Sequence, residues 1–65
     1  MKDYKELIRH RRQELGISQN QLAKRVGISQ PFMAEIESGR KKPSLDVLMR
    51  ICAELGIELF GGTQG

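Results

Sequence analysis

The chain has 65 residues, with 11 Lys and Arg against 8 Asp and Glu, a net charge of +3 and a pI near 9.4. A domain this short buries only about 60% of the surface that its unfolded chain exposes, so it has one small core and no second lobe for a multi-step enzyme. The excess of basic residues suits a polyanionic partner such as nucleic acid.

The first predicted helix covers about residues 3–15, where apolar side chains recur at helical spacing until Gly16 ends the pattern. The phrase Gly-Ile-Ser-Gln then occurs twice, at residues 16–19 and 27–30. Glycine suits the left-handed conformation after a helix, and serine accepts a hydrogen bond from the free amides that begin one. Each copy of the phrase therefore ends one helix and begins the next.

The second predicted helix covers residues 19–26, between the two copies of the phrase. Ser18 is its N-cap, and Gln21, three residues later, completes a capping box. Ile17 precedes the cap and is expected to pack against Leu22 as a hydrophobic staple. Two independent start signals therefore support this short helix.

The third predicted helix begins at Ser29 or Gln30 and ends near Ser38, before Gly39. It follows the second helix across a short connector. Two short helices joined in this way are the sequence form of a helix-turn-helix, whose second helix can enter a DNA groove.

A fourth helix is predicted over residues 45–55, after a basic loop at residues 40–42, with Ser44 as its N-cap. Apolar residues at helical spacing form the stripe that is expected to face the core. The stripe consists of Leu45, Val47, Leu48, Ile51, Cys52 and Leu55.

The last residues are less regular. Residues 57–60 alternate apolar and acidic side chains and are either a short strand or a final turn, and residues 61–65 are expected to be a flexible tail. The chain is therefore predicted to be one all-α domain over residues 1–60, a compact bundle of four or five helices with a possible short C-terminal strand.

Cys52 is the only cysteine, which excludes a disulfide framework, and no Cys/His spacing suggests a zinc site. No apolar run is long enough to cross a bilayer, and the first six residues lack the apolar stretch of a signal peptide. These features predict a cytoplasmic protein, associated with the nucleoid, that uses no cofactor or metal and contacts no membrane.

Residues 8–57, about three quarters of the chain, resemble the lambda-repressor-like, Cro/XRE helix-turn-helix family of DNA-binding domains. The matching elements are Arg12, Leu15-Gly16-Ile17-Ser18-Gln19, Leu22-Ala23, Val26-Gly27-Ile28-Ser29, Ile36-Glu37-Ser38-Gly39, Pro43-Ser44-Leu45, Leu48 and Leu55-Gly56. The resemblance implies a helical bundle that binds operator DNA, commonly as a two-fold dimer, with the third helix in the major groove.

The outer face of the third helix carries the side chains expected to read bases, namely Gln30, Pro31, Phe32, Ala34 and Glu35. Gln30 can bond bidentately to adenine, and Glu35 can accept a hydrogen bond from cytosine N4. Pro31 and Phe32 suit thymine methyl groups, although Phe32 has the alternative of folding back onto the core. Because proline disfavours helical torsions in the preceding residue, Gln30 is either the cap or the first helical residue.

Six side chains are expected at the DNA backbone, namely Arg12, Gln19, Ser29, Arg40, Lys41 and Lys42. By resemblance Gln19 corresponds to a glutamine that contacts a phosphate, and the amides that begin its helix also favour an anion. The resemblance also pairs Arg12 with Glu37 in a structural ion pair that holds Arg12 for a phosphate. The loop at residues 40–42 follows the reading helix and either approaches the sugar-phosphate chain or remains solvated.

The predicted function is a sequence-specific, double-stranded DNA-binding transcriptional regulator, acting as a repressor. Its homodimer surface is expected on the outer side of the fourth helix together with Ile57, Leu59 and Phe60. The alternative is an antitoxin that binds a toxin protein and autoregulates its operon. A further alternative is the DNA-reading head of a longer protein. The sequence has no catalytic constellation, so an enzyme is not expected.

Overall fold

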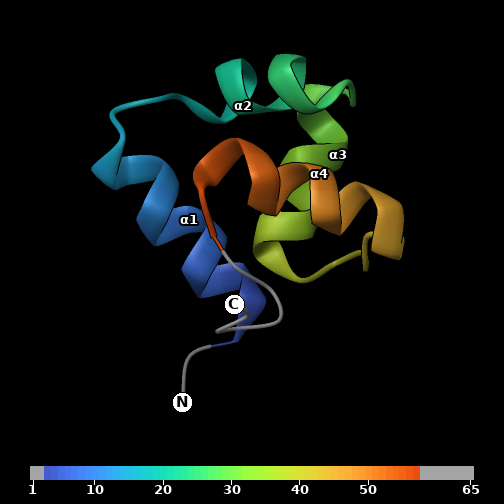
Figure 1. Cartoon of the computed structure of the whole chain (residues 1–65). Coiled ribbons are helices and arrows are strands. Elements are labelled where there is room, and N and C mark those ends of the chain that lie inside the picture. The colour runs from blue at the N-terminus through green and yellow to red at the C-terminus, as the bar shows by residue number, and fades with distance from the viewer. Residues whose placement is uncertain (1–2, 58–65) are drawn as a thin grey trace.

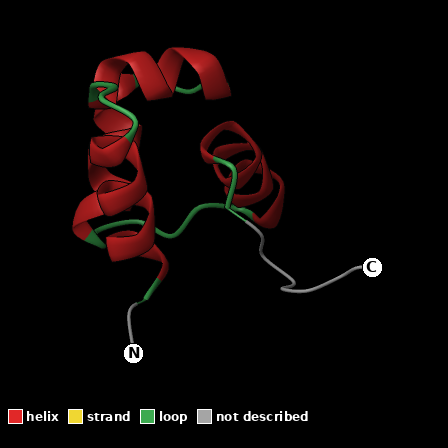
Figure 2. Cartoon of the chain, turned by 60° about the vertical axis from the view of Figure 1, so that its left-hand side comes forward, coloured by secondary structure: helices red, strands yellow, loops and turns green. Residues whose placement is uncertain are grey.

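In the computed structural model, residues 3–57 are described, and they form four helices joined by short loops (Figures 1 and 2). In chain order these are α1 (Tyr4–Glu14), α2 (Gln19–Val26), α3 (Gln30–Ser38) and α4 (Leu45–Leu55). The all-α class is confirmed, and the predicted helix bounds agree with these to within one residue. Ile57 is not in a strand, and the remainder of the predicted strand or turn and the tail at 61–65 lie outside the described residues.

Every helix begins at a polar residue whose side chain accepts a hydrogen bond from a main-chain N–H of the first turn. For α2 the capping box is complete, because Ser18 Oγ accepts from Gln21 N at 3.0 Å and Gln21 Oε1 accepts from Ser18 N at 2.8 Å. For α3 the cap is Ser29, so Gln30 is the first helical residue rather than the cap. Pro31 follows in the first turn, where its missing N–H breaks no helical hydrogen bond.

Gly39 ends α3 at a point where α1 comes close. Its φ of +85° lies in the left-handed region, which favours glycine. A Cβ at this position would also lie only 3.0 Å from Cδ of Lys5, on α1. Glycine at this position therefore serves both the helix end and the contact between α1 and α3.

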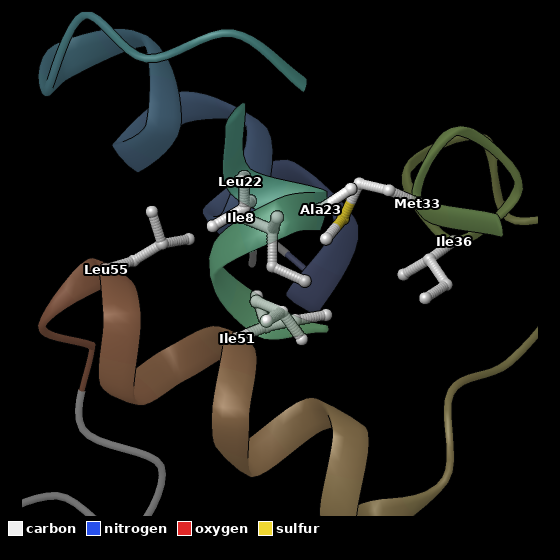
Figure 3. Packing of buried hydrophobic residues seen from close by; sticks show 8 residues of the cluster. Ile8, Leu22, Ala23, Met33, Ile36, Ile51 and Leu55 are labelled. Carbon is white, nitrogen blue, oxygen red and sulfur yellow. The ribbon is translucent and has the colours of Figure 1, made fainter. Parts of the chain in front are cut away.

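The core lies between the four helices, which pack as α2 on α3 and α4, and α1 on the same two helices. Its buried side chains come from every helix, as Figure 3 shows for most of them. They are Ile8, Leu22, Ala23, Val26, Met33, Ile36, Ile51 and Leu55. Ile17, the predicted staple residue of α2, and Ile28, which precedes the N-cap of α3, are partly buried against this cluster.

One predicted core position in α4 is wrong. The sequence places Leu45 in the apolar stripe, but the residue is 63% exposed. It is the first residue of α4, at the end of the helix beyond the core, while Ile51, Cys52 and Leu55 at the other end are buried. Val47 and Leu48 lie between, partly buried against the core.

Candidate nucleic-acid interface

The amino ends of α2 and α3 are linked by their first residues. Gln30 Nε2 donates a hydrogen bond to Gln19 Oε1 at 2.7 Å. The link uses the side-chain oxygen of Gln19 and one side-chain N–H of Gln30. The side-chain NH2 group of Gln19 can still donate, and the side-chain oxygen of Gln30 can still accept. The sequence predicted a role in DNA contact for each glutamine, but not their mutual hydrogen bond.

The predicted base-reading residues of α3 differ in exposure. Gln30 and Pro31 are exposed, and Ala34 and Glu35 are partly buried. Phe32 is partly buried and packs against the core cluster, which is the alternative that the sequence left open for it. Its predicted contact with a thymine methyl group stays a prediction.

The loop after α3 is held against the last turns of that helix by main-chain hydrogen bonds. Arg40 N donates to the main-chain oxygen of Glu35 at 2.9 Å, and Lys41 N approaches the same oxygen at 3.3 Å. Lys41 Nζ lies 3.6 Å from Glu35 Oε1. All three basic residues, Arg40, Lys41 and Lys42, are exposed. The fold thus presents the predicted basic loop beside the carboxyl end of α3, next to Glu35.

The ion pair between Arg12 and Glu37 is present and buried, with side chains 13% and 4% exposed. It is bidentate, because Nε donates to Oε2 at 2.9 Å and Nη2 donates to Oε1 at 3.0 Å. Arg12 Nη1 also donates to the main-chain oxygen of Ile17 at 3.1 Å. These bonds use three of the five guanidinium N–H groups, so the predicted phosphate contact would rely on the remaining two.

Two further basic residues of α1 contact the end of α3, and the sequence did not predict these contacts. Arg9 Nη1 donates to the main-chain oxygen of Glu37 at 3.4 Å, and the side chain of Lys5 lies over Gly39. Lys5, Arg9 and Arg12 are spaced four and three residues apart, so they share one face of α1. Their positive charges face the end of α3, where the helix dipole is negative. The spacing was the signal that could have revealed them.

Between residues 3 and 57, no group of three or more His, Cys, Asp or Glu side chains could hold a metal ion. His10 Nε2 lies 3.4 Å from Glu14 Oε2 on the exposed side of α1. Burial raises the pKa of the Cys52 thiol. None of α1 to α4 is long and apolar enough to span a bilayer.

Residues 8–61 match the helix-turn-helix family. A relative from Haemophilus influenzae, an uncharacterized HTH-type transcriptional regulator, is 50% identical over 52 residues, which are 80% of this chain and 52% of the relative. A second, from Methanothermobacter thermautotrophicus and named in the same way, is 46% identical over 52 residues, 80% of this chain and 75% of the relative. The ImmF control region 10 kDa protein of Bacillus phage phi105 is 36% identical over 53 residues, 82% of this chain and 59% of the phage protein.

The chain thus spans about half the length of the Haemophilus relative. No solved structure matches the chain.

Proposed function

The chain belongs to the Cro/XRE-type helix-turn-helix family, and from this membership we propose that it is a sequence-specific, double-stranded DNA-binding transcriptional regulator. The observation that carries the proposal is the link between Gln19 and Gln30 at 2.7 Å, which holds the first turns of α2 and α3 together. Two helix starts held side by side present main-chain N–H groups and partial positive charge to the same partner.

In this proposal α3 lies in the major groove and α2 lies across it. The amino group of Gln19 donates to a phosphate, and Ser29 and the loop at residues 40–42 contact the same backbone. Gln30 accepts from or donates to an adenine edge through the groups that the link with Gln19 leaves available. Support comes from exposure, since Gln30 and the three loop side chains are all exposed.

The buried pair of Arg12 and Glu37 supports the proposal in another way. It fastens α1 to the last turn of α3, so the reading helix is held rigidly on its scaffold. Rigid placement matters because base readout depends on the position of a few side chains at the groove edge. The role of Arg12 in this proposal is therefore first to hold α3 and second to reach a phosphate.

We further propose that the protein binds its operator as a homodimer. Leu45 and Met49 are four residues apart on α4 and are 63% and 47% exposed, and they would be covered in a two-fold contact. Of the other residues predicted at this contact, Ile57 is partly buried against the core, and Leu59 and Phe60 lie outside the described residues. A dimer would read two half-sites about 34–36 Å apart.

The antitoxin alternative is not proposed. Neither the names of the relatives reported above nor any contact among residues 3–57 points to a toxin partner.

Selection of bound duplexes from a random-sequence pool at fixed salt tests the function directly. Enrichment of one sequence motif is expected, and an inverted repeat is expected if the protein binds as a dimer. A pool that stays random after several rounds would contradict sequence-specific recognition. Sedimentation of the protein with and without the selected duplex, for wild type and Met49→Glu, tests the dimer, and equal masses for the two proteins on DNA would contradict the α4 contact.

A further inference from the structure

An open hollow on the outer side of α3 brings one acidic and one basic side chain together. Its lining residues are Ala34, Glu35, Ser38 and Arg40, and its volume is about 230 Å³. Sites for small molecules are usually larger, roughly 300–1,000 Å³, and more enclosed and apolar. A hollow that is small, open and charged suits the edge of a larger partner better than a free small molecule.

The turn after α3 fixes the two charged residues as neighbours. Glu35 O accepts hydrogen bonds from Arg40 N at 2.9 Å and from Ser38 Oγ at 3.1 Å. Ser38 Oγ also accepts from Arg40 N at 3.4 Å. Because the main chain of Arg40 is held on that of Glu35, their side chains enter the hollow from adjacent points. This geometry is set by the fold before any partner binds.

Glu35 and Arg40, the two charged residues that line the hollow, have opposite hydrogen-bonding character. The Glu35 carboxylate is an acceptor, and the Arg40 guanidinium is a donor with a planar fork. In the major groove, cytosine presents an N4 amino donor, and its paired guanine presents the O6 and N7 acceptors beside it. In an A·T pair the only donor, adenine N6, has acceptors on both sides, which would face the carboxylate unfavourably.

We therefore propose that this hollow reads one G·C base pair in each half-site, with Glu35 accepting from cytosine N4 and Arg40 donating to guanine O6 and N7. The inference rests on the proposed DNA-binding function and adds the identity of one base pair and a second residue that specifies it. It also assigns base reading to Arg40, whereas Lys41 and Lys42 keep the contacts with the DNA backbone that are expected of the whole loop.

The arrangement explains how an acidic residue is accommodated next to DNA. A carboxylate near phosphates is repelled unless a donor or a cation offsets its charge. Lys41 Nζ lies 3.6 Å from Glu35 Oε1 and supplies part of that compensation. The amino group of cytosine supplies the rest only when the matching base pair is present, so the same repulsion disfavours other pairs.

The test compares four variants of the full chain with the wild type on random-sequence duplex pools and then on the selected duplex with each base pair at each position. Glu35→Gln and Arg40→Gln remove the two groups that read the pair. Arg40→Lys keeps the charge and loses the fork. Lys42→Gln is the matched control, since Lys42 lies in the same exposed loop and does not line the hollow. Circular dichroism of each variant verifies that the helices are retained.

The wild type is expected to prefer G·C at one position of each half-site by about 5- to 150-fold. Arg40→Gln and Arg40→Lys should both lose most of that preference, and Glu35→Gln should shift the same position toward adenine. Lys42→Gln should weaken all duplexes by a common factor and keep the preference.

Two outcomes would overturn the inference while leaving the proposed function intact. In the first, Arg40→Gln weakens every duplex equally, as Lys42→Gln does. In the second, the Glu35 and Arg40 variants relax different positions of the site. A wild type that enriches no sequence at all would instead contradict both the inference and the function on which it rests.

Discussion

Glu37→Gln tests whether the buried ion pair with Arg12 holds α3 on α1. The two side chains are 4% and 13% exposed and are joined by two hydrogen bonds of 2.9 and 3.0 Å. Glutamine keeps the shape of glutamate and one acceptor oxygen, but it removes the negative charge. The substitution therefore leaves the Arg12 guanidinium charged and nearly buried, without a carboxylate.

The expected cost follows from that geometry. Removing one partner of a buried ion pair costs about 3–5 kcal/mol, because the other charge remains buried. Arg12 keeps its hydrogen bond to the main-chain oxygen of Ile17 at 3.1 Å, and the glutamine oxygen accepts another. We therefore expect a loss near the lower limit, about 3 kcal/mol. A small domain is stable by only about 5 kcal/mol or somewhat more, so the variant should fold but with much reduced stability.

Urea unfolding followed by circular dichroism measures this loss, provided that the slope against urea is unchanged. The double variant Arg12→Met with Glu37→Leu removes both charges and should recover most of the lost free energy. The control is Asp46→Asn, which breaks an exposed pair on α4 between Asp46 Oδ2 and Arg50 Nη2, 2.9 Å apart. Exposed pairs contribute below about 1 kcal/mol. If Glu37→Gln costs no more than Asp46→Asn, the buried pair does not hold α1 on α3.

Three further predictions concern stability and DNA binding. Gly39→Ala should lower the free energy of unfolding, because the φ of +85° at this position is strained for any residue with a Cβ. A urea midpoint equal to that of the wild type would contradict this strain. Because burial raises the pKa of the Cys52 thiol above its ordinary 9.0, the unfolded chain releases this proton first. The thiol's contribution to stability is then fully present below pH 9.0 and is lost as the pH rises from there toward the folded-state pKa. The plot of unfolding free energy against pH for Cys52→Ala should lack the decrease above pH 9.0 that the thiol causes. Parallel plots for the variant and the wild type would refute this prediction. For DNA binding, Lys42→Gln should reduce the slope of log affinity against log salt by about 0.9, and an unchanged slope would show that Lys42 contacts no phosphate.

The sequence alone determined the secondary structure. Each helix start depends on one capping side chain and the three residues after it. Each helix end depends on a glycine or, in α1, on the residue just before a glycine, so the signals for both ends are local. The repeated Gly-Ile-Ser-Gln phrase is sufficient to predict α2 and the beginning of α3. The family resemblance, carried by residues spread over the chain, predicted the ion pair between Arg12 and Glu37, which are 25 residues apart.

Only the tertiary structure decided how these elements meet. The hydrogen bond between Gln19 and Gln30, the packing of Phe32 against the core and the exposure of Leu45 depend on the angles at which helices cross. The hollow shared by Glu35 and Arg40 depends on how the chain turns back after Gly39. A short-range pattern specifies which face of a helix is apolar, but not how far a neighbouring helix extends over that face. That distance is set by packing among all four helices, so it becomes known only when they are assembled.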